Sequence, residues 1–503
     1  MGKGFVRFTP AGAGVALSSA ACADTGFLTV LDPRIDELRA PPIGKSWTLH
    51  QTPGLATVRL PLSTSPDYRA RRGTTTAGYN ARQPRDAAGC ALAFATSILP
   101  RPVIGANVVI VRGTGLRIAL VRGKSLSKWE MQSYEPLIGH ADITAFASTK
   151  PLFSLDDIAL NIRRLPSPDT YLARHRLLRG SLGRELWSRV GLDYLIGLER
   201  ATEGFDVLHG AETNTGYTYQ LAKIRPRRPR ARLVSTCWET IPFVEFKDPI
   251  IHRRRCFVQS RIDLFLAMTR RAADALRAEG VEEERIRVQY PGINLGQFRP
   301  LPRSASNDQG LWRHADSLRV LFVGSITFGK GIRELLRAAA EVVASPRLAG
   351  RVEFGLVGNG DLNALVPIMV SHLGLEGCVR HILKVPYAEM PALYASADLF
   401  VLPSIPTQGW EEQFGLVLAE SMACGKAVVT TTSGAIPEVV GDAVVLVPAG
   451  DYHALAQAMC DLLLDDKRRG KLGAAAAART RDLFDPEIFA ENVLKIYEEV
   501  LDS

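Results

Sequence analysis

Short apolar runs alternate with amphipathic segments over most of the chain, beginning near residue 117. Because buried parallel strands are apolar at every position, while the helices between them are apolar on one face, this alternation predicts parallel sheets covered by helices. The runs that predict strands are 117–121, 141–147, 207–209, 232–236, 264–268, 319–323, 352–357, 399–402, 427–431 and 443–447. The fold class predicted is α/β, with doubly wound sheets.

A polar stretch with several prolines after Phe298 divides this alternation into two series. Upstream of the first series, clusters of Pro, Gly, Arg and Thr show little periodicity, which is typical of disordered or loosely structured chain. We therefore expect the folded protein to start near residue 113. The predicted organisation is an extension over 1–115, a first domain over 116–302, a linker over 303–316, a second domain over 317–485 and a final helix over 486–503.

The composition is that of a globular protein: 503 residues, 46% of them hydrophobic and 22% charged, enough chain for two or three domains. Seven scattered cysteines without CxxC spacing argue against a disulfide framework or a zinc site and favour a reducing compartment. Residues 1–24 resemble a weak signal peptide, but the run is rich in Gly and Ala, so we expect a cytoplasmic protein.

The net charge of +9 is concentrated in two arginine runs. The arginines are Arg225, Arg227, Arg228, Arg230 and Arg232 in one run and Arg253, Arg254 and Arg255 in the other. Two interpretations stay open: solvated loops, or contact with an anionic membrane surface. Nucleic acid is not an expected partner, because no aromatic residues interleave with these charges.

The most informative stretch holds two acids, Glu412 and Glu420, with seven residues between them. The apolar run between them predicts a helix opening at Phe414, with Glu412 just before its N-terminus and Glu420 on its second turn. Free amides and the positive end of the helix dipole favour anions at such a place. The pattern therefore indicates a site for a sugar phosphate.

A second motif, from Gly324 to Gly331, lies between a predicted strand and a predicted helix. Its Gly-Lys spacing matches a nucleotide-binding P-loop, but Gly331 stands where that loop needs a hydroxyl to hold magnesium. Two interpretations of Lys330 remain: a solvated lysine at a helix start, or a phosphate-binding group.

Together these motifs resemble retaining glycosyltransferases of family 4, the glycosyl transferases group 1. The resemblance implies the GT-B fold, in which two Rossmann-like domains face each other across a cleft. It makes 116–302 the acceptor domain and 317–485 the nucleotide-sugar donor domain, with helix 486–503 packing back on the first domain. It also implies Lys330 and Glu412 as catalytic residues, with Glu412 contacting the donor sugar and Glu420 the ribose. Further donor contacts implied are Ser325, where many members carry arginine, Gly331, Val385, Phe414, Gly415 and Leu416.

The acceptor side matches the family less closely. His209 ends a strand in the family manner, but Ala211 stands where a second histidine is often found, so a structural role for His209 stays open. Gly123 lies in a turn that replaces the family's Gly-Gly loop. Glu212 and Trp238 complete the residues expected on this side.

The resemblance implies transfer of a hexose, with retention, from a nucleoside-diphosphate sugar to the hydroxyl of a saccharide or lipid-linked acceptor. Polysaccharide or glycolipid assembly is the expected setting, in the cytoplasm or peripherally on the inner face of the membrane. No cofactor and no metal are expected besides the nucleotide sugar as co-substrate. The alternatives are a sugar-nucleotide epimerase or phosphorylase on the same fold, and a non-catalytic nucleotide-sugar binding protein.

Overall fold

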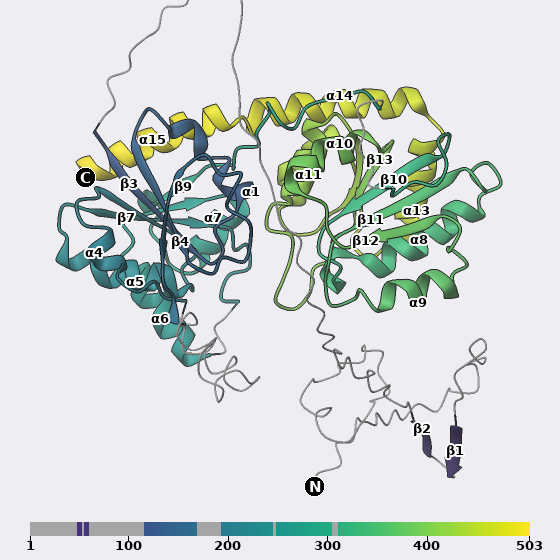
Figure 1. Ribbon diagram of the computed structural model, residues 1–503, viewed down its shortest axis with the longest axis horizontal. Coiled ribbons are helices and arrows are strands. Elements are labelled where there is room, and N and C mark those ends of the chain that lie inside the picture. Colours follow the sequence, from purple (N-terminus) through teal and green to yellow (C-terminus); the bar gives the residue numbers. More distant parts are fainter. Residues whose placement is uncertain (1–47, 53–54, 60–114, 169–192, 245–247, 304–309) are drawn as a thin grey trace, which may run out of the picture. The chain divides into compact units, whose positions relative to one another are not determined.

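The computed structural model describes residues 48–52, 55–59, 115–168, 193–244, 248–303 and 310–503 (Figure 1). The chain divides into two compact units, Met1–Ile104 and Gly105–Ser503. In the first unit, β1 (Thr48–Thr52) and β2 (Leu55–Arg59) pair antiparallel, a hairpin that the hydrophobic pattern did not predict. The rest of the expected N-terminal extension, up to residue 114, lies outside the described residues.

A seven-stranded parallel sheet organises the first domain of the second unit, in the order β5-β4-β3-β6-β7-β8-β9. Its strands are β3 (Arg117–Gly123), β4 (Asp142–Ser148), β5 (Asn161–Leu165), β6 (Val207–Ala211), β7 (Arg232–Cys237), β8 (Leu264–Ala267) and β9 (Ile286–Val288). Its described helices are α1 (Lys128–Met131), α4 (Leu198–Ala201), α5 (Gly216–Ile224), α6 (Pro249–Gln259) and α7 (Arg270–Ala278). The strand order reverses between β3 and β6, where open α/β sheets bind ligands at the carboxyl ends.

The second domain is built on a six-stranded parallel sheet in the order β12-β11-β10-β13-β14-β15. Its strands are β10 (Leu318–Val323), β11 (Val352–Val357), β12 (Val379–Ile382), β13 (Leu399–Leu402), β14 (Ala427–Thr431) and β15 (Val445–Val447). Its helices are α8 (Ile332–Ala344), α9 (Leu365–His372), α10 (Met390–Ala395), α11 (Leu416–Ala423), α12 (Ile436–Val440), α13 (Tyr452–Leu463) and α14 (Asp466–Leu483).

Burial explains why the apolar pattern predicted most of these elements. Every residue of β11 and β13 is buried, as expected of central parallel strands. In α8 the buried positions Ile332, Leu335, Leu336, Ala339 and Val342 recur every three or four residues, which is one face of a helix. Sequence reasoning missed β5, β9 and β12, which are short and carry several polar residues.

The last helix, α15 (Pro486–Asp502), belongs to the core of the first domain. Phe489, Val493 and Tyr497 are buried in one cluster with residues of β3 and β4. Residues 310–316, within the stretch expected to be a linker, lie against the second domain, where Trp312 is buried and its Nε1 donates to Ser396 Oγ at 2.9 Å.

The predicted fold class is confirmed: two parallel-sheet, Rossmann-like domains in one chain. Among the described residues, none of the helices has both the length and the apolar character needed to cross a bilayer.

Candidate functional site

Lys330 and Glu412 meet at the carboxyl ends of β10 and β13. The Lys330 ammonium lies 2.6 Å from Glu412 Oε2, which also accepts from Ser404 Oγ at 2.7 Å. Glu412 is buried, with 6% exposed. Gly331 allows this approach, because its φ is +69° and an added Cβ would lie 1.9 Å from the Pro403 carbonyl oxygen. Lys330 is therefore held where the N-terminus of α8 meets the turn after β13.

Trp410 supports Lys330 from a second side. The Lys330 ammonium lies 4.9 Å from the centre of the Trp410 ring, a cation–π distance. A Cβ on Gly329 would lie 2.6 Å from this ring, so the indole packs directly on the backbone before the lysine. No sequence signal had singled out Trp410. Ser325, where an arginine was expected, is exposed just after β10.

The turn before α11 carries the predicted sugar-binding amides. Phe414 is buried, Gly415 has a φ of +81° as N-cap, and the helix begins at Leu416, two residues later than predicted. The first amides of a helix have no acceptor within it, and they carry the positive end of the dipole. The Phe414 ring lies 6.1 Å from that of Trp238, which follows β7 in the first domain.

Glu420 lies on α11 with only 2% of its surface exposed. One oxygen accepts from Tyr387 Oη at 2.7 Å and the other from Tyr394 Oη at 2.8 Å. Burial raises the pKa of Glu420 to about 7, and the two tyrosine hydrogen bonds oppose that rise. Tyr387 comes two residues after the predicted contact Val385, which is itself buried, and sequence reasoning had not assigned its side chain a role. The carboxylate is thus fixed in position by neutral donors.

His209 lies inside the first domain rather than on its surface. It is fully buried, with Nδ1 2.6 Å from Tyr497 Oη and Nε2 2.8 Å from Thr236 Oγ1. Burial keeps the pKa of its imidazole well below the usual value, so the ring is neutral. These contacts fit the structural role of His209 that the sequence left open, in which it ties α15 to β6 and β7.

Gly123 is also enclosed. Its φ is +58°, and an added Cβ would lie 2.0 Å from the ring of Tyr217, whose hydroxyl accepts from the Lys124 amide at 3.1 Å. The preceding Arg122 is buried, and its Nε donates to Glu130 Oε1 at 2.5 Å. The turn that replaces the family's Gly-Gly loop is therefore held by internal contacts.

Glu212 has two unusual properties. Its backbone φ is +59°, a left-handed conformation that non-glycine residues seldom adopt and that is enriched at functional sites. Its Oε1 accepts from the Trp238 amide at 2.7 Å. Burial raises the pKa of Glu212 to about 7, and the Trp238 hydrogen bond opposes that rise. The carboxyl ends of β6 and β7 thus bring the expected residues Glu212 and Trp238 together.

Several contacts join this region of the first domain to the second. Arg271, on α7, donates to Glu411 from Nε at 2.5 Å and from Nη2 at 2.9 Å. The Glu438 carboxylate accepts from the Arg270 amide at 2.6 Å and the Arg271 amide at 3.2 Å, at the N-terminus of α7. Glu411, which precedes Glu412, is therefore an ion-pair partner that links the two domains.

Most arginines of the two runs form ion pairs or hydrogen bonds within the protein. Arg225 pairs with Asp263 at 2.8 Å and Arg255 with Glu279 at 2.7 Å, while Arg232 donates to the Val500 carbonyl at 2.7 Å. Arg228 and Arg254 likewise donate to backbone carbonyls. The runs therefore offer less free charge to a membrane than the sequence suggested. Within the described residues, no group of three or more His, Cys, Asp or Glu side chains is arranged to hold a metal ion.

Two family models match the chain: "Glycosyl transferases group 1" over residues 307–479 and "Glycosyl transferase 4-like domain" over residues 139–292. Similar curated proteins include the D-inositol 3-phosphate glycosyltransferase of Thermobispora bispora, 35% identical over 227 residues, or 44% of this chain and 51% of that protein. The protein of the same name from Nocardioides sp. is 34% identical over 230 residues, which cover 43% of this chain and 49% of that protein. The chain thus spans about half the length of these relatives.

Solved structures of the same architecture include sucrose-phosphate synthase from Thermosynechococcus elongatus, with a TM-score of 0.60 and 22% identity over 77% of this chain and 99% of that one. Anabaena HepE in complex with UDP also has a TM-score of 0.60, with 19% identity over 76% of this chain and 99% of that one. These likenesses define the class: the fold is GT-B. The chain belongs to the group 1 glycosyltransferases of the family 4 type, which confirms the predicted family.

Proposed function

We propose that this protein transfers a hexose from a nucleoside-diphosphate sugar to an acceptor hydroxyl, with retention of configuration. The observation that carries the proposal is the pairing of Lys330 with the buried Glu412 at the N-terminus of α8. A cation held there, beside the first amides of α11, suits a diphosphate that gains negative charge as it leaves. The relative HepE is named in complex with UDP-glucose, which supports a nucleotide sugar as the donor.

In this mechanism the Lys330 ammonium stabilises the leaving diphosphate, while Glu412 accepts from hydroxyls of the hexose. Glu420 accepts from the ribose hydroxyls with the lone pairs that Tyr387 and Tyr394 leave free. The acceptor hydroxyl attacks the anomeric carbon on the face from which the diphosphate departs. The bond from this carbon to the diphosphate breaks, and the hydroxyl proton passes to the departing diphosphate. Most of the catalysis then comes from charge stabilisation and from orientation of the two substrates.

The acceptor is a saccharide or a lipid-linked saccharide, bound by the side of the first domain that carries Glu212 and Trp238. The relatives named D-inositol 3-phosphate glycosyltransferases support a polyhydroxylated acceptor of this kind. Assembly of a polysaccharide or glycolipid is the setting that we propose.

A thermal-shift screen against UDP-, GDP-, ADP- and dTDP-sugars, followed by a transfer assay with the stabilising donor, tests the proposal. A donor at 100 times its dissociation constant stabilises the protein by about 2.7 kcal/mol. We expect one base to give the shift and Glu420→Ala to abolish it. Donor consumption without transfer would favour an epimerase or a phosphorylase, and binding without turnover would favour a nucleotide-sugar binding protein.

A further inference from the structure

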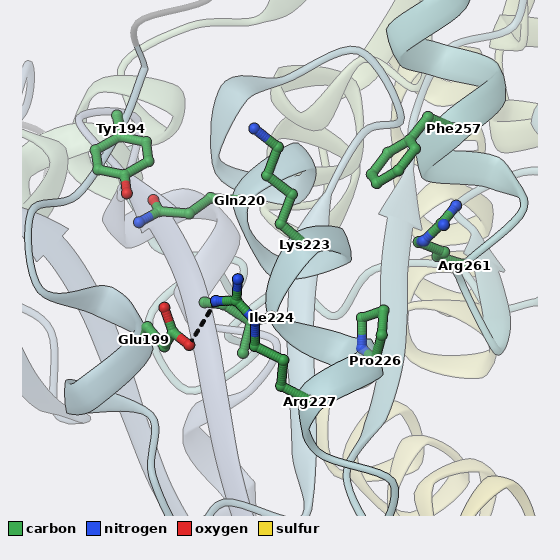
Figure 2. A pocket seen from close by; sticks show the side chains of 9 residues that line it. All are labelled: Tyr194, Glu199, Gln220, Lys223, Ile224, Pro226, Arg227, Phe257 and Arg261. Carbon is green, nitrogen blue, oxygen red and sulfur yellow. Dashed lines mark hydrogen bonds and ion pairs between the residues drawn. The ribbon is translucent and has the colours of Figure 1, made fainter.

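A cavity of about 480 Å³ lies in the first domain, between the C-terminal halves of α5 and α6 (Figure 2). Its lining includes three cationic side chains, Lys223, Arg227 and Arg261, and one acidic side chain, Glu199. The aromatic rings of Tyr194 and Phe257 also line the cavity. None of these residues belongs to the donor or acceptor site described above.

The cavity lies near the amino ends of the strands, whereas that site lies at their carboxyl ends. Helix α5 begins at Gly216, just after the carboxyl end of β6, and runs back along the sheet. Lys223, in the last turn of α5, is therefore close to the amino end of β7. Arg261 likewise follows the end of α6 and precedes the start of β8. Glu212 and Trp238, by contrast, follow the carboxyl ends of β6 and β7. A ligand in this cavity would therefore be remote from the reacting sugar.

Two of the cations rest on aromatic rings rather than on carboxylates. Arg261 Cζ lies 3.9 Å from the centre of the Phe257 ring, and Lys223 Nζ lies 4.3 Å from that of Tyr219. The two rings are themselves in edge contact, with centroids 5.4 Å apart. Within the part of the chain that the structure describes, neither cation has a carboxylate at ion-pair distance. A cation held by a ring keeps most of its N–H donors for another acceptor.

The rest of the wall is fixed by internal hydrogen bonds. Gln220 is buried, and its side chain accepts from the Leu195 amide at 3.0 Å and donates to the Leu195 carbonyl at 2.8 Å. These two hydrogen bonds fix the segment that carries Tyr194. Arg227 is paired with Glu199 at 2.9 Å, and both side chains are largely exposed (Figure 2). Three cations against one carboxylate leave the cavity with a net positive charge.

We propose that this cavity binds the phosphate group of a ligand other than the sugar donor. The guanidinium fork of Arg261 and the ammonium of Lys223 match phosphate oxygens in charge and in donor geometry. The ring array sets both cations in place before the ligand arrives, which lowers the entropy cost of binding. The phosphate belongs either to a soluble phosphorylated molecule or to the headgroup of a lipid, and the chemistry of recognition is the same for both.

Titration of the full-length protein with inorganic pyrophosphate, by calorimetry, tests the first source. Flotation with phosphatidylcholine vesicles that contain or lack phosphatidylglycerol tests the second. All proteins carry Lys330→Ala, which weakens binding of pyrophosphate at the donor site, and any remaining binding there is common to the test variant and its control. The test variant adds Lys223→Gln and Arg261→Gln. The matched control adds Arg230→Gln and Arg253→Gln, which also remove two positive charges, from exposed arginines that do not line the cavity.

We expect binding to pyrophosphate or to the anionic vesicles to weaken at least tenfold in the test variant, about 1.4 kcal/mol, and to be unchanged in the control. Binding to pyrophosphate would identify a soluble ligand, and binding to anionic vesicles alone a lipid headgroup. Absence of both, or equal binding by the test variant and the control, would overturn the proposal. Because donor transfer is measured separately, failure of this proposal and failure of the proposed activity are distinguishable.

Discussion

The Lys330 ammonium donates to the Glu412 carboxylate across 2.6 Å, although 82 positions separate the two residues in the chain. Glu412 is almost completely buried, so this contact brings an ammonium group to an anion within the protein, and Ser404 adds a neutral donor. Such an arrangement positions the Lys330 ammonium before any ligand binds. Preorganised charge of this kind is what stabilisation of a leaving diphosphate requires.

Lys330→Ala should lower the rate of transfer by roughly 10²- to 10³-fold, the usual effect of removing one preorganised donor. The melting temperature should fall as well, because the buried Glu412 carboxylate loses its charged partner and keeps the hydrogen bond from Ser404. Rates are therefore compared well below the melting temperature of the variant. Initial rates at saturating donor and acceptor measure the effect. Lys495→Ala, which removes an exposed lysine on α15, is the matched control and should transfer at the wild-type rate. Transfer by Lys330→Ala at the wild-type rate would remove Lys330 from the mechanism.

Glu420 should make the stability of the protein depend on pH. Its pKa is about 7 in the folded protein and near 4.5 when unfolded, so between these values only the folded state holds the proton. Stability from this residue is therefore present below pH 4.5 and is lost as the pH rises through 7, by at most about 1.4 kcal/mol per pH unit.

The Glu420→Gln variant cannot titrate, so its melting temperature relative to wild type should rise between pH 5 and pH 7 and level off above pH 7. Other titrating groups are common to both proteins and cancel in this difference. Thermal denaturation at intervals of half a pH unit gives the profile. Parallel curves for the two proteins would show that burial does not raise the pKa of this carboxyl group.

Glu212→Gln should lower kcat/KM for the acceptor and leave the KM for the donor unchanged. The loss of a charged hydrogen-bond acceptor corresponds to about 1.5 to 3 kcal/mol, roughly a tenfold to hundredfold drop in kcat/KM for the acceptor. Because the pKa of Glu212 is about 7, wild-type kcat/KM should rise as the pH increases through 7, when the carboxylate forms. The variant should lack this rise, and a variant that retained it would assign the titration to another group.

Deletion of residues 1–112 should leave folding and transfer intact. Among the residues of the second unit that the structure describes, the first strand is β3 and the first buried residue is Leu116. Circular dichroism and the donor thermal shift of the shortened protein, beside those of the full chain, measure the outcome. An insoluble product, or loss of the donor shift, would show that the upstream segment takes part in the folded enzyme.

Local sequence carried much of the information about the second domain. The acids at 412 and 420, the apolar run between them and the Lys330-Gly331 pair are short patterns whose geometry follows from helix starts and glycine turns. The structure places the Lys330 ammonium 2.6 Å from Glu412 Oε2. The apolar strands were predictable for the same reason, since a buried parallel strand needs apolar side chains at every position.

Other features depended on what the folded chain places around a residue. His209 and Glu212 are three positions apart in the sequence, yet one is enclosed by Tyr497 and Thr236, while the other has a strained backbone beside Trp238. Nothing in the local pattern distinguishes them, because burial and hydrogen-bond partners come from α15 and β7, distant in the chain. The same holds for the arginine runs, in which Arg225 pairs with Asp263 and Arg255 with Glu279.

The sequence by itself therefore determined the family and most strands of the two sheets, since each follows from periodicity or from a motif within a few residues. Only the tertiary structure decided which polar residues are enclosed, which side chains are ion-paired and where the cavity lined by Lys223, Arg227 and Arg261 lies. The physical reason is that exposure, pKa and ion pairing are set by the long-range contacts of a packed chain.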